Sequence, residues 1–156
     1  MKTHNTLPKK IKAQSIDLLA ARLADALDAW SHAKQAHWNV RGPGFIALHE
    51  LFDKTADLLA ESADSLAERL ATLGGSPSGT ARDVAKATSL KPYPHGIASE
   101  RKHVEALCAS LAALAQSWRE AIDASDSWGD AVTTDLFTRI TGDLDKQIWL
   151  IESHNA

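Results

Sequence analysis

The stretch "QAHWNVRGPGFIALHELFD", Gln35 to Asp53, contains the predicted end of one helix, a tight turn and the start of another. The turn is "RGPG", because proline lacks a backbone donor and paired glycines favour a turn over a continued helix. His37 lies before the turn, and His49 and Asp53 lie after it. Imidazole and carboxylate groups are common metal ligands, so the stretch predicts a helical hairpin with metal-binding side chains near its bend.

Apolar residues recur at intervals of three and four on both sides of this stretch, which is the period of one helix face. The first predicted helix runs from about Ile16 to Asn39, and the second ends at Gly74-Gly75, a typical C-terminal cap. The four stripes span Ile16–Trp30, Leu48–Leu73, Val104–Ile122 and Val132–Ile151, with "ASDSWGD" separating the last two. No stretch has the alternating pattern of a strand.

Residues 76–96 are rich in proline and predict a long connection with one short helix around "ARDVAKA". Such a connection is long enough to cross the length of a bundle. The sequence therefore predicts an all-α fold, an antiparallel four-helix bundle with a long crossover that carries a short extra helix. We expect one bundle domain over residues 15–154 and a mobile basic tail over residues 1–14.

The chain of 156 residues is 44% hydrophobic and has a net charge of −3, which argues against a uniformly basic nucleic-acid binder. The lone Cys108 allows no internal disulfide, and neither a signal peptide nor a membrane-spanning run is apparent. These features predict a cytoplasmic protein. The first sixteen residues contain four lysines and no acid: Lys2, Lys9, Lys10 and Lys12.

A second polar stripe runs along the second predicted helix. With Leu48 as zero on a helical wheel, the core leucines fall within about 40°, whereas His49, Asp53, Asp64 and Glu68 fall at roughly 100° to 200°. His49 and Asp53 are four residues apart, as are Asp64 and Glu68, so each pair can bind one ion. The pairs cannot share an ion within one chain, because eleven residues of helix span about 16 Å.

Two interpretations of this stripe follow. Each pair is an ordinary solvated patch, or a second copy of the chain supplies the missing half. Antiparallel packing about a two-fold axis would bring His49 and Asp53 of one copy opposite Asp64 and Glu68 of the other. His37 would add a nitrogen ligand, and a mixed set of imidazoles and carboxylates suits iron better than calcium or structural zinc.

Four stretches then carry a family resemblance: "QAHWNVRGPGFIALHELFD", "DSLAERLATLGGSP", "LKPYPHG" and "DLDKQIWLIES". From about Ile16 to Ser153 the chain resembles the DNA-binding protein from starved cells (Dps) family, the mini-ferritins of the ferritin-like superfamily. The resemblance implies a homo-dodecameric ferroxidase and iron store that oxidises Fe(II), with hydrogen peroxide as preferred oxidant, and so protects DNA. It places the Fe(II)/Fe(III) ligands and catalytic residues between subunits, at His37, His49, Asp53, Asp64 and Glu68.

The resemblance also concerns iron entry and DNA. The stretch "DASDSWGDAVTTD" resembles the region that lines the family's three-fold pores, so Asp126, Asp130 and Asp135 are predicted to attract cations there.

DNA-binding members use mobile lysine-rich tails, which makes Lys2, Lys9, Lys10 and Lys12 the predicted DNA contacts. The alternatives are a DNA-compacting nucleoid protein with iron handling secondary, a tail that is only a solubilising end, and a helical scaffold.

Other aromatic and ionisable residues receive simpler interpretations. Three tryptophans lie in or beside the stripes and are predicted to be core: Trp30, Trp118 and Trp149. Trp38 is predicted to pack at a dimer interface or, by the resemblance, to intercept oxidising equivalents near iron.

Three histidines are predicted to lie at the surface or an interface: His32, His95 and His154. "ERKH" matches one Glu-x-x-His motif of larger di-iron bundles, but without a second such motif Glu100 is predicted to be an acid at a helix N-terminus.

Overall fold

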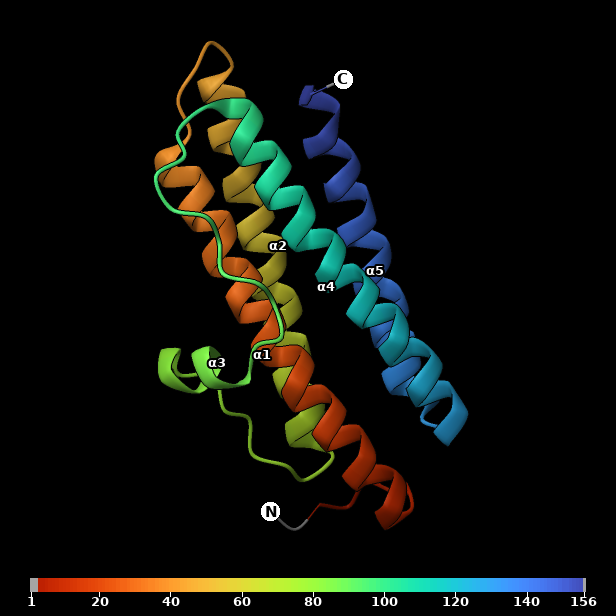
Figure 1. Cartoon of the computed structure of the whole chain (residues 1–156). Helices are drawn as coiled ribbons and strands as arrows, with labels where there is room; N and C mark the ends of the chain where they lie inside the picture. The colour runs from red at the N-terminus through yellow and green to blue at the C-terminus, as the bar shows by residue number, and fades with distance from the viewer. Residues whose placement is uncertain (1–2, 156) are drawn as a thin grey trace.

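A computed structural model describes residues 3–155 of the chain and confirms the predicted all-α, four-helix bundle (Figure 1). Its elements are α1 (Lys9–Asn39), α2 (Phe45–Thr72), α3 (Ala81–Ala87), α4 (Glu100–Trp128), α5 (Ala131–Glu152) and the 3-10 turn η1 (Ser153–Asn155). α1 and α2 form one antiparallel hairpin and α4 and α5 form another, and the chain from α3 to α4 runs back along α1 (Figure 1). Over the described residues no helix has both the length and the apolar character needed to cross a bilayer.

The core lies between the two hairpins and is built from the predicted stripes. The stripe on α2 is buried throughout, at Leu48, Phe52, Leu59, Leu66, Leu70 and Leu73. Trp118 of α4 is fully buried, as predicted, but Trp149 is 59% exposed. The prediction for Trp149 is wrong because the neighbouring residues Gln147 and Ile151 face the core, and a residue two positions from each points to the opposite side of the helix.

The first helix begins earlier than its apolar stripe predicts. Pro8 precedes Lys9, and its carbonyl accepts a hydrogen bond from Lys12 N at 3.0 Å. Proline is well suited to a helix start, and lysine is a good helix former even without a core contact. Consequently Lys9, Lys10 and Lys12 lie in α1, and the predicted tail boundary at residue 14 falls inside this helix; Lys2 lies outside the described residues.

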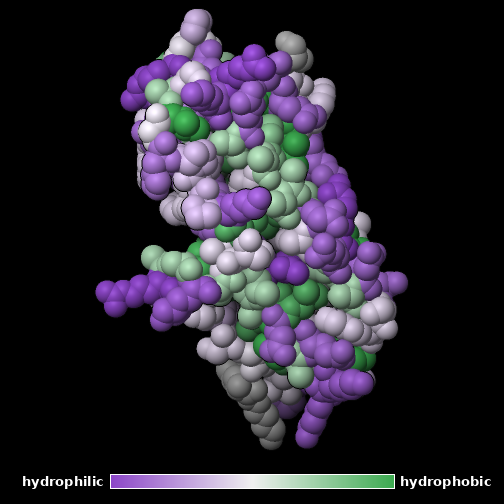
Figure 2. Space-filling model, in the orientation of Figure 1, coloured by the Kyte–Doolittle hydropathy of each residue, from purple (hydrophilic) through white to green (hydrophobic). Residues whose placement is uncertain are grey.

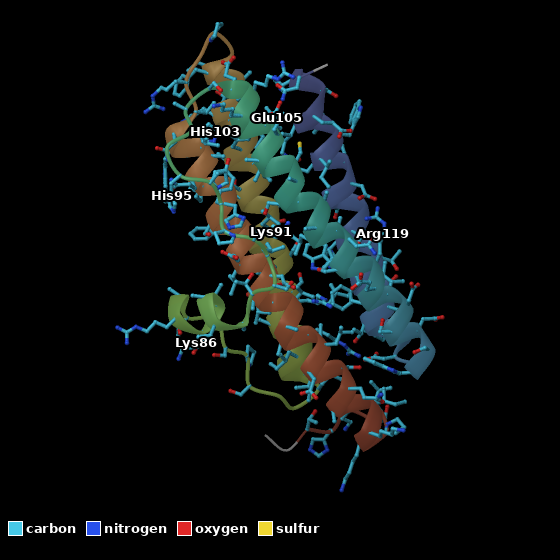
Figure 3. The ribbon with its side chains drawn as sticks, in the orientation of Figure 1. Lys86, Lys91, His95, His103, Glu105 and Arg119 are labelled. Atoms are coloured by element: carbon cyan, nitrogen blue, oxygen red, sulfur yellow. The ribbon has the colours of Figure 1, made fainter. Side chains whose placement is uncertain are left out.

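The crossover is fastened to the bundle by buried polar groups. Asp25 of α1 accepts a hydrogen bond from Ser89 N at 2.7 Å, and the Tyr93 hydroxyl lies 2.9 Å from His103 Nδ1. His103 Nε2 lies 3.0 Å from the Ile97 carbonyl oxygen and therefore donates to it, so Nδ1 is the acceptor for Tyr93. Figure 3 shows His103 where the crossover passes over the start of α4.

Of the histidines predicted at the surface, His95 and His154 are exposed but His32 is buried. Its Nδ1 lies 2.7 Å from Ser110 Oγ of α4, and its ring lies 5.3 Å from that of Tyr93. The prediction for His32 is wrong because the crossover covers this part of α1. Glu100 is the first residue of α4, as expected of an acid at a helix N-terminus.

Candidate metal centre

His37 and His49 face each other across the turn between α1 and α2. Their rings stack with centroids 3.7 Å apart and planes 20° apart. His37 Nδ1 donates to the His49 carbonyl oxygen at 2.7 Å, and His49 Nδ1 donates to the His37 carbonyl oxygen at 2.9 Å. A carbonyl oxygen only accepts, so each Nδ1 carries a proton, and in the neutral ring Nε2 is the nitrogen that can bind a metal ion. This reciprocal pairing orients two nitrogen ligands before any metal ion arrives.

Asp53 lies one helical turn after His49. Its Oδ1 is 3.9 Å from His37 Nδ1 and 2.5 Å from the Lys34 ammonium, and its side chain is 45% exposed. The hydrogen bond from Lys34, aided by the nearby histidines, holds the pKa of Asp53 below its usual value despite partial desolvation. The carboxylate is therefore ionised at neutral pH and available to a cation.

Lys34 is a site residue that the sequence interpretation missed. It lies on α1 one turn before His37, so both side chains emerge on the same face of the helix. That spacing was the one feature of the sequence that could have identified Lys34 as a site residue. Its contact with Asp53 also depends on how α1 and α2 are rotated against each other. Trp38 completes this group: the residue is 58% exposed, and the centroid of its ring lies 5.8 Å from Lys34 Nζ.

Asp64 and Glu68 are exposed and stay away from the other three predicted ligands. α2 is continuous from Phe45 to Thr72, so the separation of about 16 Å between Asp53 and Asp64 holds along the helix axis. Within residues 3–155, no group of three histidine, cysteine or acidic side chains is close enough to bind an ion. The chain thus stacks His37 on His49 and places Asp53 Oδ1 3.9 Å from His37 Nδ1, without arranging the three as an ion-binding cluster, and it presents Asp64 and Glu68 separately.

An apolar hollow of about 460 Å³ lies between α1 and α2 beside Asp64. Its lining is Leu23, Leu27, Trp30, Ala60, Ala63, Asp64, Ala67, Pro77 and Gly79. Trp30 at the hollow is 39% exposed, which contradicts its prediction as a core residue. Most of the surface seen in Figure 2 is hydrophilic, with apolar side chains gathered toward the middle.

The predicted pore residues do not share one environment. Asp126 and Asp135 are exposed, whereas Asp130 is 1% exposed and caps the start of α5. Its Oδ1 accepts from Arg69 at 2.7 Å, and its Oδ2 accepts from Ser15 at 2.7 Å and from Thr133 at 2.6 Å. Because both oxygens are occupied by groups from α1, α2 and α5, we assign Asp130 a structural role and not a place in a pore.

Comparison with known proteins gives a consistent relationship. Residues 16–156 match the family model described as a ferritin-like domain. The chain is 43% identical over 157 residues to a DNA protection during starvation protein of Agrobacterium fabrum, covering 99% of this chain and 97% of the relative. A protein of the same name from Mycolicibacterium smegmatis is 33% identical over 148 residues, covering 95% and 80% respectively.

Solved structures of Dps proteins have the same fold as this chain. Mycobacterium smegmatis Dps superposes with a TM-score of 0.93 at 33% identity, covering 98% of this chain and 87% of that one. DpsC from Streptomyces coelicolor superposes with a TM-score of 0.94 at 28% identity, covering 100% and 91%. Both similarities extend over all the helices that carry the five predicted ligands.

Proposed function

This chain belongs to the ferritin-like family, in its Dps branch, and from that premise we propose that it is a ferroxidase and iron-storage mini-ferritin. Fe(II) is its substrate, hydrogen peroxide its oxidant, and a dodecameric cage holds the ferric mineral. The observation that supports this proposal is the pair of reciprocally bonded histidines, whose Nδ1–H groups donate to each other's carbonyl oxygens, with Asp53 Oδ1 3.9 Å from His37 Nδ1.

The proposed centre forms between two copies of the chain. His37, His49 and Asp53 from one copy supply two nitrogens and one carboxylate, which leaves the coordination of an iron ion incomplete. Asp64 and Glu68 of a second copy complete it, and two-fold symmetry forms the site twice. The apolar hollow beside Asp64 supports this arrangement, because its contact with another chain would bury Trp30 next to a proposed ligand.

The ligand set fits both the substrate and the product. Imidazole nitrogens favour Fe(II), and the three carboxylates offset the added positive charge when Fe(III) forms. Hydrogen peroxide accepts one electron from each of two Fe(II) ions, and with two protons it leaves as two molecules of water. No hydroxyl radical is released in this balance, which is how the protein would protect DNA.

Subunit complementation tests the shared site. One variant carries His37→Ala and His49→Ala, and the other carries Asp64→Asn and Glu68→Gln. Each alone should lose peroxide-driven Fe(II) oxidation, because every site in it lacks one half. After unfolding and refolding together, a mixed pair has one intact site and one doubly defective site, so about a quarter of wild-type activity should return.

A mixture that regains nothing, although mass spectrometry shows mixed assemblies, contradicts the shared site. Full activity in the Asp64→Asn, Glu68→Gln variant alone contradicts it as well. A double variant at exposed acids elsewhere on α2, Asp57→Asn with Glu61→Gln, is the matched control and should retain oxidation.

DNA contact through the basic N-terminal residues is a second candidate, and the names of the relatives motivate it. Lys9 and Lys10 are exposed at the start of α1, whereas Lys12 Nζ donates to the Asn5 carbonyl oxygen at 2.5 Å. Replacing Lys9 and Lys10 with glutamine keeps α1 intact, unlike deletion of residues 1–14. This change should abolish gel retardation of DNA at low salt and leave iron oxidation unchanged; retained retardation would exclude these two contacts.

A further inference from the structure

The Lys34 ammonium already binds the carboxylate that the proposed centre needs. Its Nζ lies 2.5 Å from Asp53 Oδ1 and 5.8 Å from the centroid of the Trp38 ring. Asp53 Oδ1 is also the carboxylate oxygen that lies 3.9 Å from His37. The ammonium therefore binds the same oxygen of Asp53 that lies near His37.

An ammonium and a divalent metal ion compete for this position. Both are attracted to the Asp53 carboxylate, and two positive charges within a few ångströms repel each other even in water. Lysine is suited to exchange, because its compact charge is carried on a flexible four-carbon stem. The Lys34 side chain is 21% exposed and that of Asp53 is 45% exposed, so solvent reaches the pair and the ammonium can leave.

The contact has little value as a structural bond. Ion pairs this exposed contribute little to the free energy of unfolding. Its geometric effect is larger, because the ammonium holds Asp53 beside the histidines while no metal ion is bound.

We propose that Lys34 is a resident counter-ion which an incoming metal ion must displace, and that it determines which cations the centre accepts. This inference rests on the proposed function, since it takes Asp53 as a ligand. Mg²⁺ and Ca²⁺ prefer oxygen ligands and gain little from imidazole, so they compete poorly with the ammonium for the carboxylate. Fe(II) and Co(II) also gain the two Nε2 atoms and can displace it.

Lys34→Gln separates this role from a structural one. Anaerobic Co(II) titration of the assembled protein, followed by visible absorption, measures binding without iron turnover. Removing the competing cation should tighten Co(II) binding about 10-fold. Mg²⁺ should then inhibit Co(II) binding at a concentration at least about 10-fold lower than in the wild type, because its affinity depends on the carboxylate.

Two further variants control the charge and the location. Lys34→Arg keeps the positive charge and should bind Co(II) no more tightly than the wild type, because a guanidinium holds a carboxylate at least as well as an ammonium does. Lys54→Gln removes an exposed lysine directly after Asp53 and should leave Co(II) affinity and Mg²⁺ inhibition unchanged. A Lys34→Gln protein that behaves like Lys54→Gln, or binds Co(II) more weakly than wild type, overturns the counter-ion role.

A different result would contradict the proposed function itself. If His37→Ala binds Co(II) as tightly as the wild type, the histidine half-site is wrong and the Lys34 proposal fails with it. If His37→Ala weakens Co(II) binding while Lys34→Gln has no effect, the half-site stands and only the role of Lys34 is rejected.

Discussion

Asp130 shows how one side chain can join three helices. Its carboxylate is buried and accepts hydrogen bonds from Ser15 of α1, Arg69 of α2 and Thr133 of α5. Burial alone would raise the pKa of Asp130, but the hydrogen bonds from Thr133 and Ser15 and the charge of Arg69 outweigh it. The pKa of Asp130 therefore lies below its ordinary value.

Asp130→Asn should lower the free energy of unfolding at pH 7 by about 3 kcal/mol, because it leaves the Arg69 guanidinium without its buried partner. Urea denaturation followed by circular dichroism measures the change. Asp126→Asn is the matched control on an exposed acid and should change stability by less than about 0.5 kcal/mol. Equal effects of the two substitutions would refute the structural role of Asp130.

The same pair predicts a pH dependence. A carboxyl group with a lowered folded pKa stabilises the protein above its unfolded pKa of about 4, and this stability is lost as the pH falls through the lower folded value. The wild type should therefore lose stability more steeply than Asp130→Asn below about pH 4. Parallel stability curves for the two proteins would contradict this assignment.

At the scale of elements, the crossover depends on a small buried network. Tyr93 donates to His103 Nδ1, and His103 Nε2 donates to the Ile97 carbonyl oxygen, so the imidazole is neutral in the fold. Burial lowers the pKa of His103, and the charge of Arg41 adds to this effect. Desolvation likewise lowers the pKa of His32, although Asp28 partly opposes it.

Tyr93→Phe should lower the free energy of unfolding by about 1 to 2 kcal/mol, because it leaves a buried acceptor on His103 without a donor. Hydrogen exchange of residues 88–99 should accelerate, while exchange in the centre of α2 stays slow. His95→Ala is the control, since His95 is exposed on the same crossover. Unchanged exchange in Tyr93→Phe would show that the hydroxyl does not fasten the crossover.

Acid should loosen the same element in the wild type. With folded pKa values below the unfolded value of about 6.5, His32 and His103 favour the unfolded chain once the pH falls below that value. The protection factors of residues 88–99, which are corrected for the intrinsic pH dependence of exchange, should therefore fall between about pH 6.5 and pH 5. An exchange free energy that is constant over this range would contradict the neutral state of these histidines.

The helices could be predicted from the sequence because long apolar stripes mark the faces that pack together. The start of α1 could not, since the stripe records only the buried part of a helix, whereas Lys9 and Lys10 are exposed and Ile11 and Lys12 are half-buried. His37, His49 and Asp53 were predictable because a tight turn brings them together. The burial of Asp130 was not, because an acid that binds three separate helices looks like any solvated acid in sequence.

The sequence pattern does not predict the position of Lys34 relative to Asp53. Its contact with Asp53 depends on the rotation of α1 against α2, and helix spacing within either helix leaves that rotation open. The exposure of Trp30 could not be predicted either, because it depends on a hollow formed by two helices and the segment after α2.

At the scale of the whole molecule, one chain carries two unlike halves of the proposed centre. The histidine half lies at the bend of the α1–α2 hairpin, and the acidic half lies about three helical turns further along α2, beside the apolar hollow. A partner that fills the hollow is therefore expected to complete the metal site. Assembly and metal binding should be lost together when the hollow is made polar.

Trp30→Glu places a charge at the hollow and should prevent pairing, because an unpaired charge is costly to bury at an interface. Light scattering should show smaller species with unchanged helical circular dichroism, and Co(II) affinity should fall by more than about 10-fold. The added carboxylate cannot repel a cation, so weaker binding would reflect the lost partner. Trp149→Glu, at an exposed tryptophan of α5, should keep the centre. A Trp30→Glu monomer that oxidises Fe(II) at the wild-type rate would show instead that one chain suffices.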